Sequence, residues 1–186
     1  MSALFPPTEP LTDGVVTLRL WTEADAPARS RAFHGDAELV RWTDLPYDYD
    51  AGEALADIRR GHELLDVGER LSFAVLDARS AVIGGIDLML TAYDRAELGY
   101  AITASARRQG NATRALRLLS DWSLSHLGVH RLELPVPLGN VASAGVARGA
   151  GYEPEGQLRS FLALRDGGPR YDVTMFSRVR AVGAER

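Results

Sequence analysis

Residues 96–119 read AELGYAITASARRQGNATRALRLL, and this stretch decides how the rest of the chain is interpreted. A strand is expected from Ala96 to Ile102, and Gly110 opens a helix that is expected to reach about Leu127. The junction between them reads RRQGNA. Small residues there let a ligand approach the backbone, and the first N–H groups of a helix have no partner within it. The junction therefore predicts a phosphate-binding turn, to which Arg107 and Arg108 add positive charge.

Two familiar phosphate-binding loops do not fit this junction. All 21 basic residues are arginine, so the chain cannot contain the Gly-Lys-Ser/Thr run of a Walker A loop. A dinucleotide fingerprint needs three glycines in G-x-G-x-x-G spacing, and the junction has only Gly110. These observations disfavour a nucleotide-binding protein that uses the same helix end. An ordinary helix that begins at a glycine remains the alternative for the junction alone.

The elements around this stretch alternate between helices and strands. Strands are expected at Val15–Leu20, Leu71–Leu76, Val82–Leu90, His130–Val136, from Gly151 onward and at Arg170–Val179. Helices are expected from Thr22 to about His34, over Asp36–Arg41, from Asp50 to about Asp66 and over Asn140–Gly149. Short turns make neighbouring strands antiparallel, so the order predicts an α+β fold with one mixed, mostly antiparallel twisted sheet of about six to seven strands and flanking helices.

Composition excludes several classes of function. A net charge of −4 without a basic stripe argues against nucleic acid as a partner. No apolar run approaches the roughly 20 residues that cross a bilayer, and the first ten residues lack signal-peptide features, so we expect no membrane association and a cytoplasmic location. The chain has no cysteine, which removes disulfides and thiolate chemistry, and its four histidines lack metal-ligand spacing. No metal is expected.

RRQGNA fits the Q/R-x-x-G-x-G/A signature of the GNAT superfamily of acetyltransferases. The chain also carries TLRLWTEAD, IGGI, AELGYAI and NVAS followed by GAGYEPEG, in matching order and spacing. From about Val15 to Val179 it resembles GNAT proteins, most closely the subfamily of ribosomal-protein N-terminal (alanine) acetyltransferases. The resemblance implies one GNAT domain over residues 1–186, a core at about 15–179 with flexible tails, and a splayed central strand pair.

The resemblance also implies acetyl-CoA as co-substrate. Backbone N–H groups would hold its pyrophosphate at Gln109, Gly110, Asn111, Ala112 and Thr113. Main-chain groups of Tyr100, Ala101 and Ile102 would pair with pantetheine, and an N–H near Tyr100 would stabilise the oxyanion. Asn140 is expected to contact CoA, to cap a helix, or to do both.

Two residues are expected to perform the chemistry. Ser143 would donate a proton to the departing thiolate, the alternative being an ordinary first-turn residue; Ala147 stands where many GNAT proteins carry a tyrosine acid. Glu97 would act as base, directly or through water, the alternative being a solvent-facing or ion-paired strand residue. Asp87 and Asp172 are the other candidate bases. Leu162 occupies a position where some relatives carry a carboxylate, so that role does not transfer.

The amine acceptor is expected near four residues of an aromatic loop, Trp42, Asp44, Tyr47 and Tyr49, which hold an ammonium group or pin the loop to the core. A protein N-terminus and a small-molecule amine both fit. A free α-amine, with a pKa of about 7.7 to 8.0, needs little help from a base. The sequence leaves three alternatives open. The chain could be a CoA-binding module without turnover, it could transfer a longer acyl group such as succinyl, and it could form a homodimer.

Overall fold

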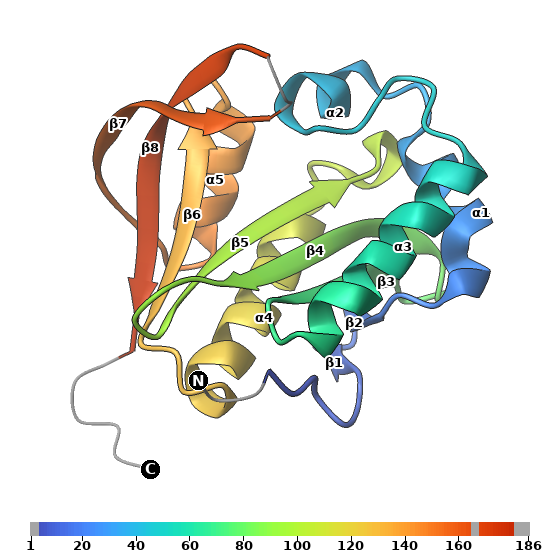
Figure 1. Ribbon diagram of the computed structural model, residues 1–186, viewed down its shortest axis with the longest axis horizontal. Helices are drawn as coiled ribbons and strands as arrows, with labels where there is room; N and C mark the ends of the chain where they lie inside the picture. The colour runs from blue at the N-terminus through green and yellow to red at the C-terminus, as the bar shows by residue number, and fades with distance from the viewer. Residues whose placement is uncertain (1–3, 165–167, 181–186) are drawn as a thin grey trace.

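The structure, a computed structural model, describes residues 4–164 and 168–180 and contains one eight-stranded sheet (Figure 1). The strands lie in the order β1-β2-β3-β4-β5-β6-β8-β7. Their bounds are β1 Leu11–Thr12, β2 Val16–Leu20, β3 Arg70–Asp77, β4 Val82–Leu90, β5 Arg95–Ile102, β6 Arg131–Pro137, β7 Glu153–Ala163 and β8 Arg170–Val179. The sheet has more strands than the six to seven expected, because the two-residue β1 pairs with β2.

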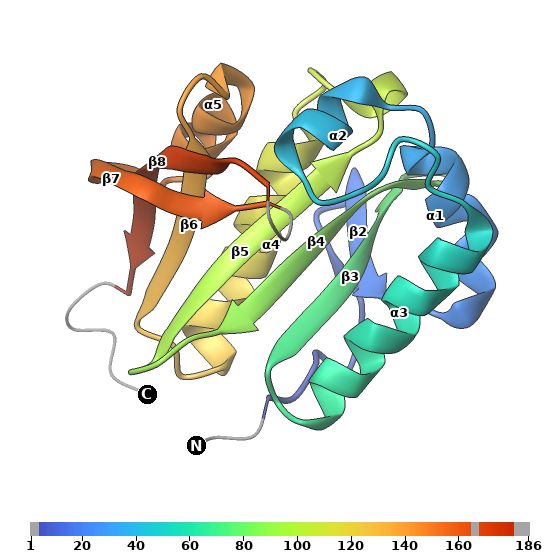
Figure 2. The ribbon, with the colours of Figure 1, turned by 45° about the horizontal axis from the view of Figure 1, so that its top comes forward.

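Helices cover both faces of this sheet (Figures 1 and 2). Their bounds are α1 Ala26–Phe33, α2 Ala37–Trp42, α3 Ala51–Asp66, α4 Asn111–His126 and α5 Val141–Gly149, with short 3₁₀ turns at Glu23–Asp25 and Ala104–Ala106. Helices α1 and α3 pack on one face of the β2–β4 half, whereas α4 lies behind β5 and α5 behind β6. Among the helices of the described residues, none has the length and apolar character needed to span a bilayer.

The sheet opens between β5 and β6. These two strands are parallel and pair only from Arg95–Glu97 to Arg131–Glu133, although β5 continues to Ile102 and β6 to Pro137. All other neighbouring strands are antiparallel. The expected fold class and the splayed central pair are confirmed. After Glu97, no strand within the described residues pairs with the edge of β5 that faces β6.

The core consists of two apolar clusters on opposite faces of the sheet. The larger cluster joins Leu116 and Leu119 of α4 to Phe73, Leu88 and Leu98 of the central strands. The smaller cluster lies under α1 and α3 and contains Trp21, Phe33, Tyr49, Ile58 and Ala74. Alternate residues of β3 contribute to different clusters because successive side chains of a strand point to opposite faces. The two clusters hold β3 from both sides, and the larger cluster also contains residues of β5 and β6.

Local interactions define the helix starts and one tight strand contact. Asp50 and Glu53 form the expected capping box of α3, with both hydrogen bonds at 2.9 Å. The Asp25 carboxylate accepts the N–H of Thr22 at 2.8 Å. In the IGGI segment of β4, a Cβ on Gly84 would lie 2.3 Å from the Ala101 carbonyl oxygen. Only glycine allows β4 and β5 to approach so closely there.

Candidate active site

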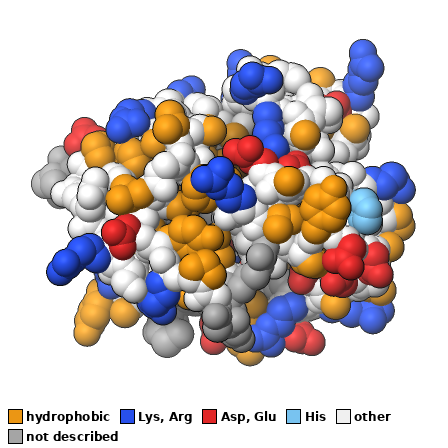
Figure 3. Space-filling view, turned by 90° about the horizontal axis from the view of Figure 1, so that it is seen from above, with side chains coloured by type: hydrophobic (Ala, Val, Ile, Leu, Met, Phe, Trp, Pro, Cys, Tyr) orange, Lys and Arg blue, Asp and Glu red, His pale blue; other side chains and the backbone are white. Residues whose placement is uncertain are grey.

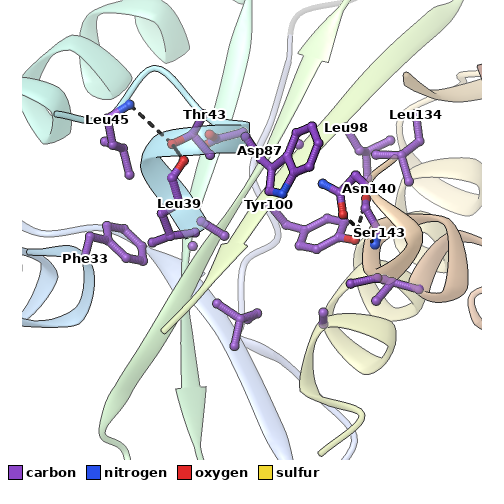
Figure 4. A pocket seen from close by; sticks show the side chains of 18 of the residues that line it. Phe33, Leu39, Thr43, Leu45, Asp87, Leu98, Tyr100, Leu134, Asn140 and Ser143 are labelled. Carbon is purple, nitrogen blue, oxygen red and sulfur yellow. Dashed lines mark hydrogen bonds between the residues drawn. The ribbon is translucent and has the colours of Figure 1, made fainter. Parts of the chain in front are cut away.

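A cavity of about 1200 Å³ begins in the opening between β5 and β6 and continues to α2. One part, the α4 arm, is lined by Tyr100, Ala101, Ile102, Arg107, Arg108, Gly110, Asn111, Ala112, Thr113, Asn140 and Ser143. The other part, the α2 arm, is lined by Phe33, Glu38, Leu39, Trp42, Asp44, Leu45, Asp57, Arg70, Asp87, Glu97 and Gly99. Figure 4 shows Phe33, Leu39 and Leu45 on one side and Leu134, Asn140 and Ser143 on the other. A single cavity thus joins the expected phosphate turn to the expected base.

The start of α4 is not capped by a side chain. Gly110 adopts a left-handed conformation with φ at 81°, and a Cβ there would meet nothing within 4 Å. Arg114 donates the first backbone hydrogen bond of the helix, to the Gly110 carbonyl at 3.0 Å. The preceding N–H groups, from Asn111 to Thr113, are therefore left at the helix end, where the positive end of the helix dipole attracts an anion. All three of these residues line the cavity.

The polar side chains of the turn before α4 differ in whether they are bonded within the protein. Arg107 donates from Nε to the Ile102 carbonyl at 2.9 Å and forms an ion pair with Asp36. Its guanidinium is thus held by protein groups, contrary to the expectation that it reaches a phosphate. The side chains of Gln109 and Asn111 also bond within the protein, to the carbonyls of Ser105 and Ala106. Arg108, exposed and without an ion-pair partner among the described residues, is the arginine available to a ligand.

Ser143 lies in the first turn of α5, at the wall of the α4 arm. Asn140 caps this helix, since its Oδ1 accepts the Ser143 N–H at 3.0 Å. The Ser143 hydroxyl is 2.9 Å from the hydroxyl of Tyr100, which comes from β5 (Figure 4). Burial raises the pKa of Tyr100 to about 12, and the hydrogen bond to Ser143 acts in the opposite direction. Sequence reasoning assigned only the main chain of Tyr100 to the site, because nothing local marks the partner of its hydroxyl.

Glu97 is the ionisable residue of the α2 arm with the most distinctive environment. It lies opposite Glu133 in the parallel pairing of β5 and β6. Burial, and after it the charge of Glu133, raises the pKa of Glu97. Glu133 itself accepts bonds from Arg95 and Arg131. No hydrogen bond or ion pair joins Glu97 to another described side chain, so its carboxylate is free to take a proton.

The other two candidate bases are engaged with the protein. Asp87 forms a 2.5 Å ion pair with Arg70. On the sheet, Asp87 of β4 lies directly opposite Gly99 of β5. The Asp172 carboxylate accepts the Ser160 N–H at 2.7 Å, and Asp172 is not part of the cavity wall. Arg70, which the sequence did not mark, has a buried Nε without a hydrogen-bond partner. These pairings favour Glu97 over both aspartates as the base.

The four residues expected at the acceptor site separate into two groups. Trp42 and Asp44 line the cavity, and the Trp42 ring packs 6.4 Å from the ring of Tyr171 on β8. Tyr47 is 59% exposed and lies outside the cavity wall. Tyr49 is only 1% exposed; its hydroxyl accepts from Arg29 at 2.8 Å and donates to Asp57 at 2.7 Å. Tyr49 therefore pins the loop to the core, and we keep only Trp42 and Asp44 in the site.

Figure 3 views this end of the molecule, where hydrophobic side chains gather beside carboxylate and arginine groups. An eight-stranded sheet opens beside an uncapped helix end, and a serine and a glutamate line the same cavity, an arrangement suited to an acyltransferase. Residues 16–153 match the acetyltransferase (GNAT) domain. The chain belongs to the GNAT acetyltransferase family.

Individual relatives agree with this assignment. The chain is 29% identical over 181 residues to "Uncharacterized N-acetyltransferase YoaA" of Bacillus subtilis, covering 95% of this chain and 98% of that protein. Among solved structures, Mycobacterium smegmatis RimJ in complex with CoA-disulfide superposes with a TM-score of 0.81 at 24% identity, covering 92% and 86% of the two chains. RimL, a ribosomal L7/L12 alpha-N-protein acetyltransferase in complex with CoA, gives 0.80 at 21% identity, covering 92% and 98%. At these identities, the two structural matches show the shared fold.

Proposed function

We propose that this acetyltransferase uses acetyl-CoA as its donor and transfers the acetyl group directly to a primary amine. The observation that carries the proposal is the single cavity that joins three features: the uncapped start of α4, the unpaired edge of β5 beyond Glu97, and the Ser143 hydroxyl. A diphosphate fits the first feature and an extended amide chain the second. The third lies where a thiol leaving group requires a proton.

The donor would be held mainly by backbone groups. The N–H groups at Asn111, Ala112 and Thr113 would receive the diphosphate, with Arg108 adding a charge from the exposed side of the turn. Pantetheine would follow β5 along Tyr100 and Ala101, as an added strand does. The Ile102 carbonyl already accepts from Arg107 and the Ala101 carbonyl faces β4, so pairing at the open edge falls to the main-chain groups of Tyr100.

The reaction requires one proton to leave the amine and one to reach the sulfur. Glu97 would accept the proton of the attacking amine, directly or through a water molecule. The amine nitrogen attacks the thioester carbon, and a β5 backbone N–H near Tyr100 stabilises the oxyanion. As the C–S bond breaks, the Ser143 side of the cavity supplies the proton to the sulfur.

The charges of the α2 arm support an acceptor that arrives as a cation. The three arginines that line the cavity on this side, Arg29, Arg60 and Arg70, are each paired with a carboxylate. Three carboxylates of the arm, those of Glu38, Asp44 and Glu97, have no ion-pair partner among the described residues. A net negative potential attracts an ammonium group and raises its local concentration. A protein N-terminus and a small-molecule amine both meet this requirement.

A panel assay tests the proposal. Peptides with free N-termini, the same peptides with blocked N-termini, and small polyamines are incubated with acetyl-CoA or succinyl-CoA. Because the chain has no cysteine, thiol release can be measured with a disulfide reagent without background from the enzyme. We expect acceptor-dependent release of CoA with acetyl-CoA and an acetylated product by mass spectrometry. Tight CoA binding without acceptor-dependent release would instead indicate a binding module.

A further inference from the structure

The hydroxyls of Tyr100 and Ser143 form an isolated pair in the wall of the cavity. They are 2.9 Å apart and come from β5 and α5, 43 residues apart in the sequence. No other hydrogen bond of the Tyr100 hydroxyl is present among the described residues. Ser143 is held in place from the other side, because Asn140 accepts its backbone N–H. The pair therefore has a fixed geometry beside the unpaired edge of β5, where the donor thioester is proposed to lie.

We propose that Tyr100 is the acid of the reaction and that Ser143 passes its proton to the sulfur. This inference rests on the proposed function and extends it to a residue whose side chain had no role. Tyr100 donates to the Ser143 oxygen, and Ser143 donates to the sulfur. When the C–S bond breaks, both protons move one step: the Ser143 proton joins the thiolate, and the Tyr100 proton replaces it. The products are a thiol, a neutral serine and a tyrosinate, which regains a proton from water in the open cavity.

Acidities favour this relay over a serine that acts alone. A thiol has a pKa of about 8.5, and water, to which a serine hydroxyl is similar, has a pKa of about 15.7. A serine acting alone would therefore give its proton to a thiolate whose conjugate acid has a pKa roughly seven units lower. Burial raises the pKa of Tyr100 only to about 12. A phenol is therefore the better matched acid, since proton donation is most efficient when donor and acceptor pKa values are close. The serine contributes position, and the tyrosine contributes acidity.

The chain contains a matched control pair. Tyr152 and Ser120 also join hydroxyl to hydroxyl, at 2.7 Å, but in the core between α4 and the start of β7, away from the cavity. Tyr152→Phe removes a phenol hydroxyl from a buried Tyr–Ser pair, just as Tyr100→Phe removes one from a partly buried pair. Any general effect of losing such a hydrogen bond on folding appears in both variants. An effect on proton transfer appears only in Tyr100→Phe.

The test measures thiol release from acetyl-CoA with and without an amine. Without an amine, water slowly hydrolyses the thioester, and this reaction also requires a proton for the departing thiolate. We expect Tyr100→Phe to lower kcat on the order of 100-fold with KM for acetyl-CoA unchanged, and Tyr152→Phe to retain the wild-type kcat. Ser143→Ala should lower kcat by a similar factor. The Tyr100→Phe/Ser143→Ala double variant should have the same kcat as either single variant, because the two residues act as one unit. Equal kcat values for Tyr100→Phe and Tyr152→Phe, or additive losses, would overturn the relay.

A second measurement separates proton donation from mere positioning. Difluorotyrosine at position 100 keeps the hydroxyl but lowers the phenol pKa into the range where kcat is measurable. We expect an alkaline fall in kcat that the wild type lacks, since an ionised phenol has no proton to give. A pH profile identical to that of the wild type would contradict the relay. Absence of amine-dependent release would refute the proposed function, while the hydrolytic release would still decide the role of Tyr100. If the wild type releases no thiol at all, both are wrong.

Discussion

The guanidinium of Arg107 forms an ion pair with the carboxylate of Asp36, which joins the turn before α4 to the first turn of α2. The other oxygen of Asp36 accepts the N–H groups of Glu38 and Leu39 and so caps α2. The side chain of Asp36 is only 10% exposed. One carboxylate thus holds together the two segments that border the two arms of the cavity.

Asp36→Ala should therefore destabilise the protein by more than the loss of a helix cap. A cap is worth about 1 kcal/mol, and leaving Arg107 without its largely buried partner should add a further 1 to 3 kcal/mol, roughly. The free energy of unfolding from urea titration measures the sum. Asp50→Ala is the control, because Asp50 caps α3 in the same way and forms no ion pair with any residue that the structure describes. Equal losses in the two variants would show that the Arg107 contact contributes nothing.

Gly99 offers a way to block the α2 arm without disturbing the fold. A Cβ at this position meets nothing within 4 Å, and the residue lies in the cavity wall beside Asp87. Gly99→Leu should raise KM for the amine by about tenfold or more, because about 1.4 kcal/mol of lost binding has that effect. The affinity for CoA, measured by calorimetry, should change little.

The control for this variant is Gly156→Leu on β7, where a Cβ also meets nothing within 4 Å and the residue lies outside the cavity wall. It reports the general effect of leucine at a strand glycine. Steady-state kinetics in which Gly99→Leu matches Gly156→Leu would place the acceptor elsewhere.

The pH dependence of kcat/KM should report Glu97. A base must be ionised to work, and burial together with Glu133 raises the pKa of Glu97 above 4.5. Activity should therefore fall as the pH drops through this raised pKa. Glu97→Gln should lower kcat/KM about 100-fold or more. Glu133→Gln removes the neighbouring charge, so the fall of kcat/KM on the acid side should move to lower pH. If this fall does not move, it reports protonation of the amine substrate and not of Glu97.

The same shift predicts that Glu97 lowers stability above the acid range. Because the pKa of Glu97 is higher in the folded than in the unfolded chain, the folded state binds this proton more tightly, and stability falls as pH rises from 4.5 through the raised pKa. Glu97→Gln should be more stable than the wild type at pH 7, and the two should converge near pH 4. Melting temperatures across this range check the sign. A less stable glutamine variant at pH 7 would show that Glu97 forms a stabilising contact.

Local patterns in the sequence predicted most elements. The bounds expected for β4 and β8 are those observed, and the predicted α4 helix differs from the observed one by a single residue at each end. Long apolar or alternating segments are readable in this way because periodicity is a local property. The two-residue β1 was missed, since so short a strand has no period.

Contacts between distant residues could not be predicted. Tyr100 and Ser143 are 43 positions apart, and Arg107 and Asp36 are 71 positions apart, so no local pattern joins them. The aromatic loop shows the same limit. Trp42 and Tyr49 are both amphipathic aromatics, and only packing decides that one borders the cavity while the other is buried.

Calorimetric titration of CoA into three proteins tests most directly whether the start of α4 receives the diphosphate. The proteins are the wild type, Gly110→Asn and Gly110→Asp; asparagine and aspartate have the same size and both tolerate the left-handed backbone of Gly110, with φ at 81°. They differ in one negative charge at the helix end. The proposed site predicts that CoA binds Gly110→Asp at least about tenfold more weakly than Gly110→Asn, and both more weakly than the wild type. Equal affinity in all three proteins would contradict it.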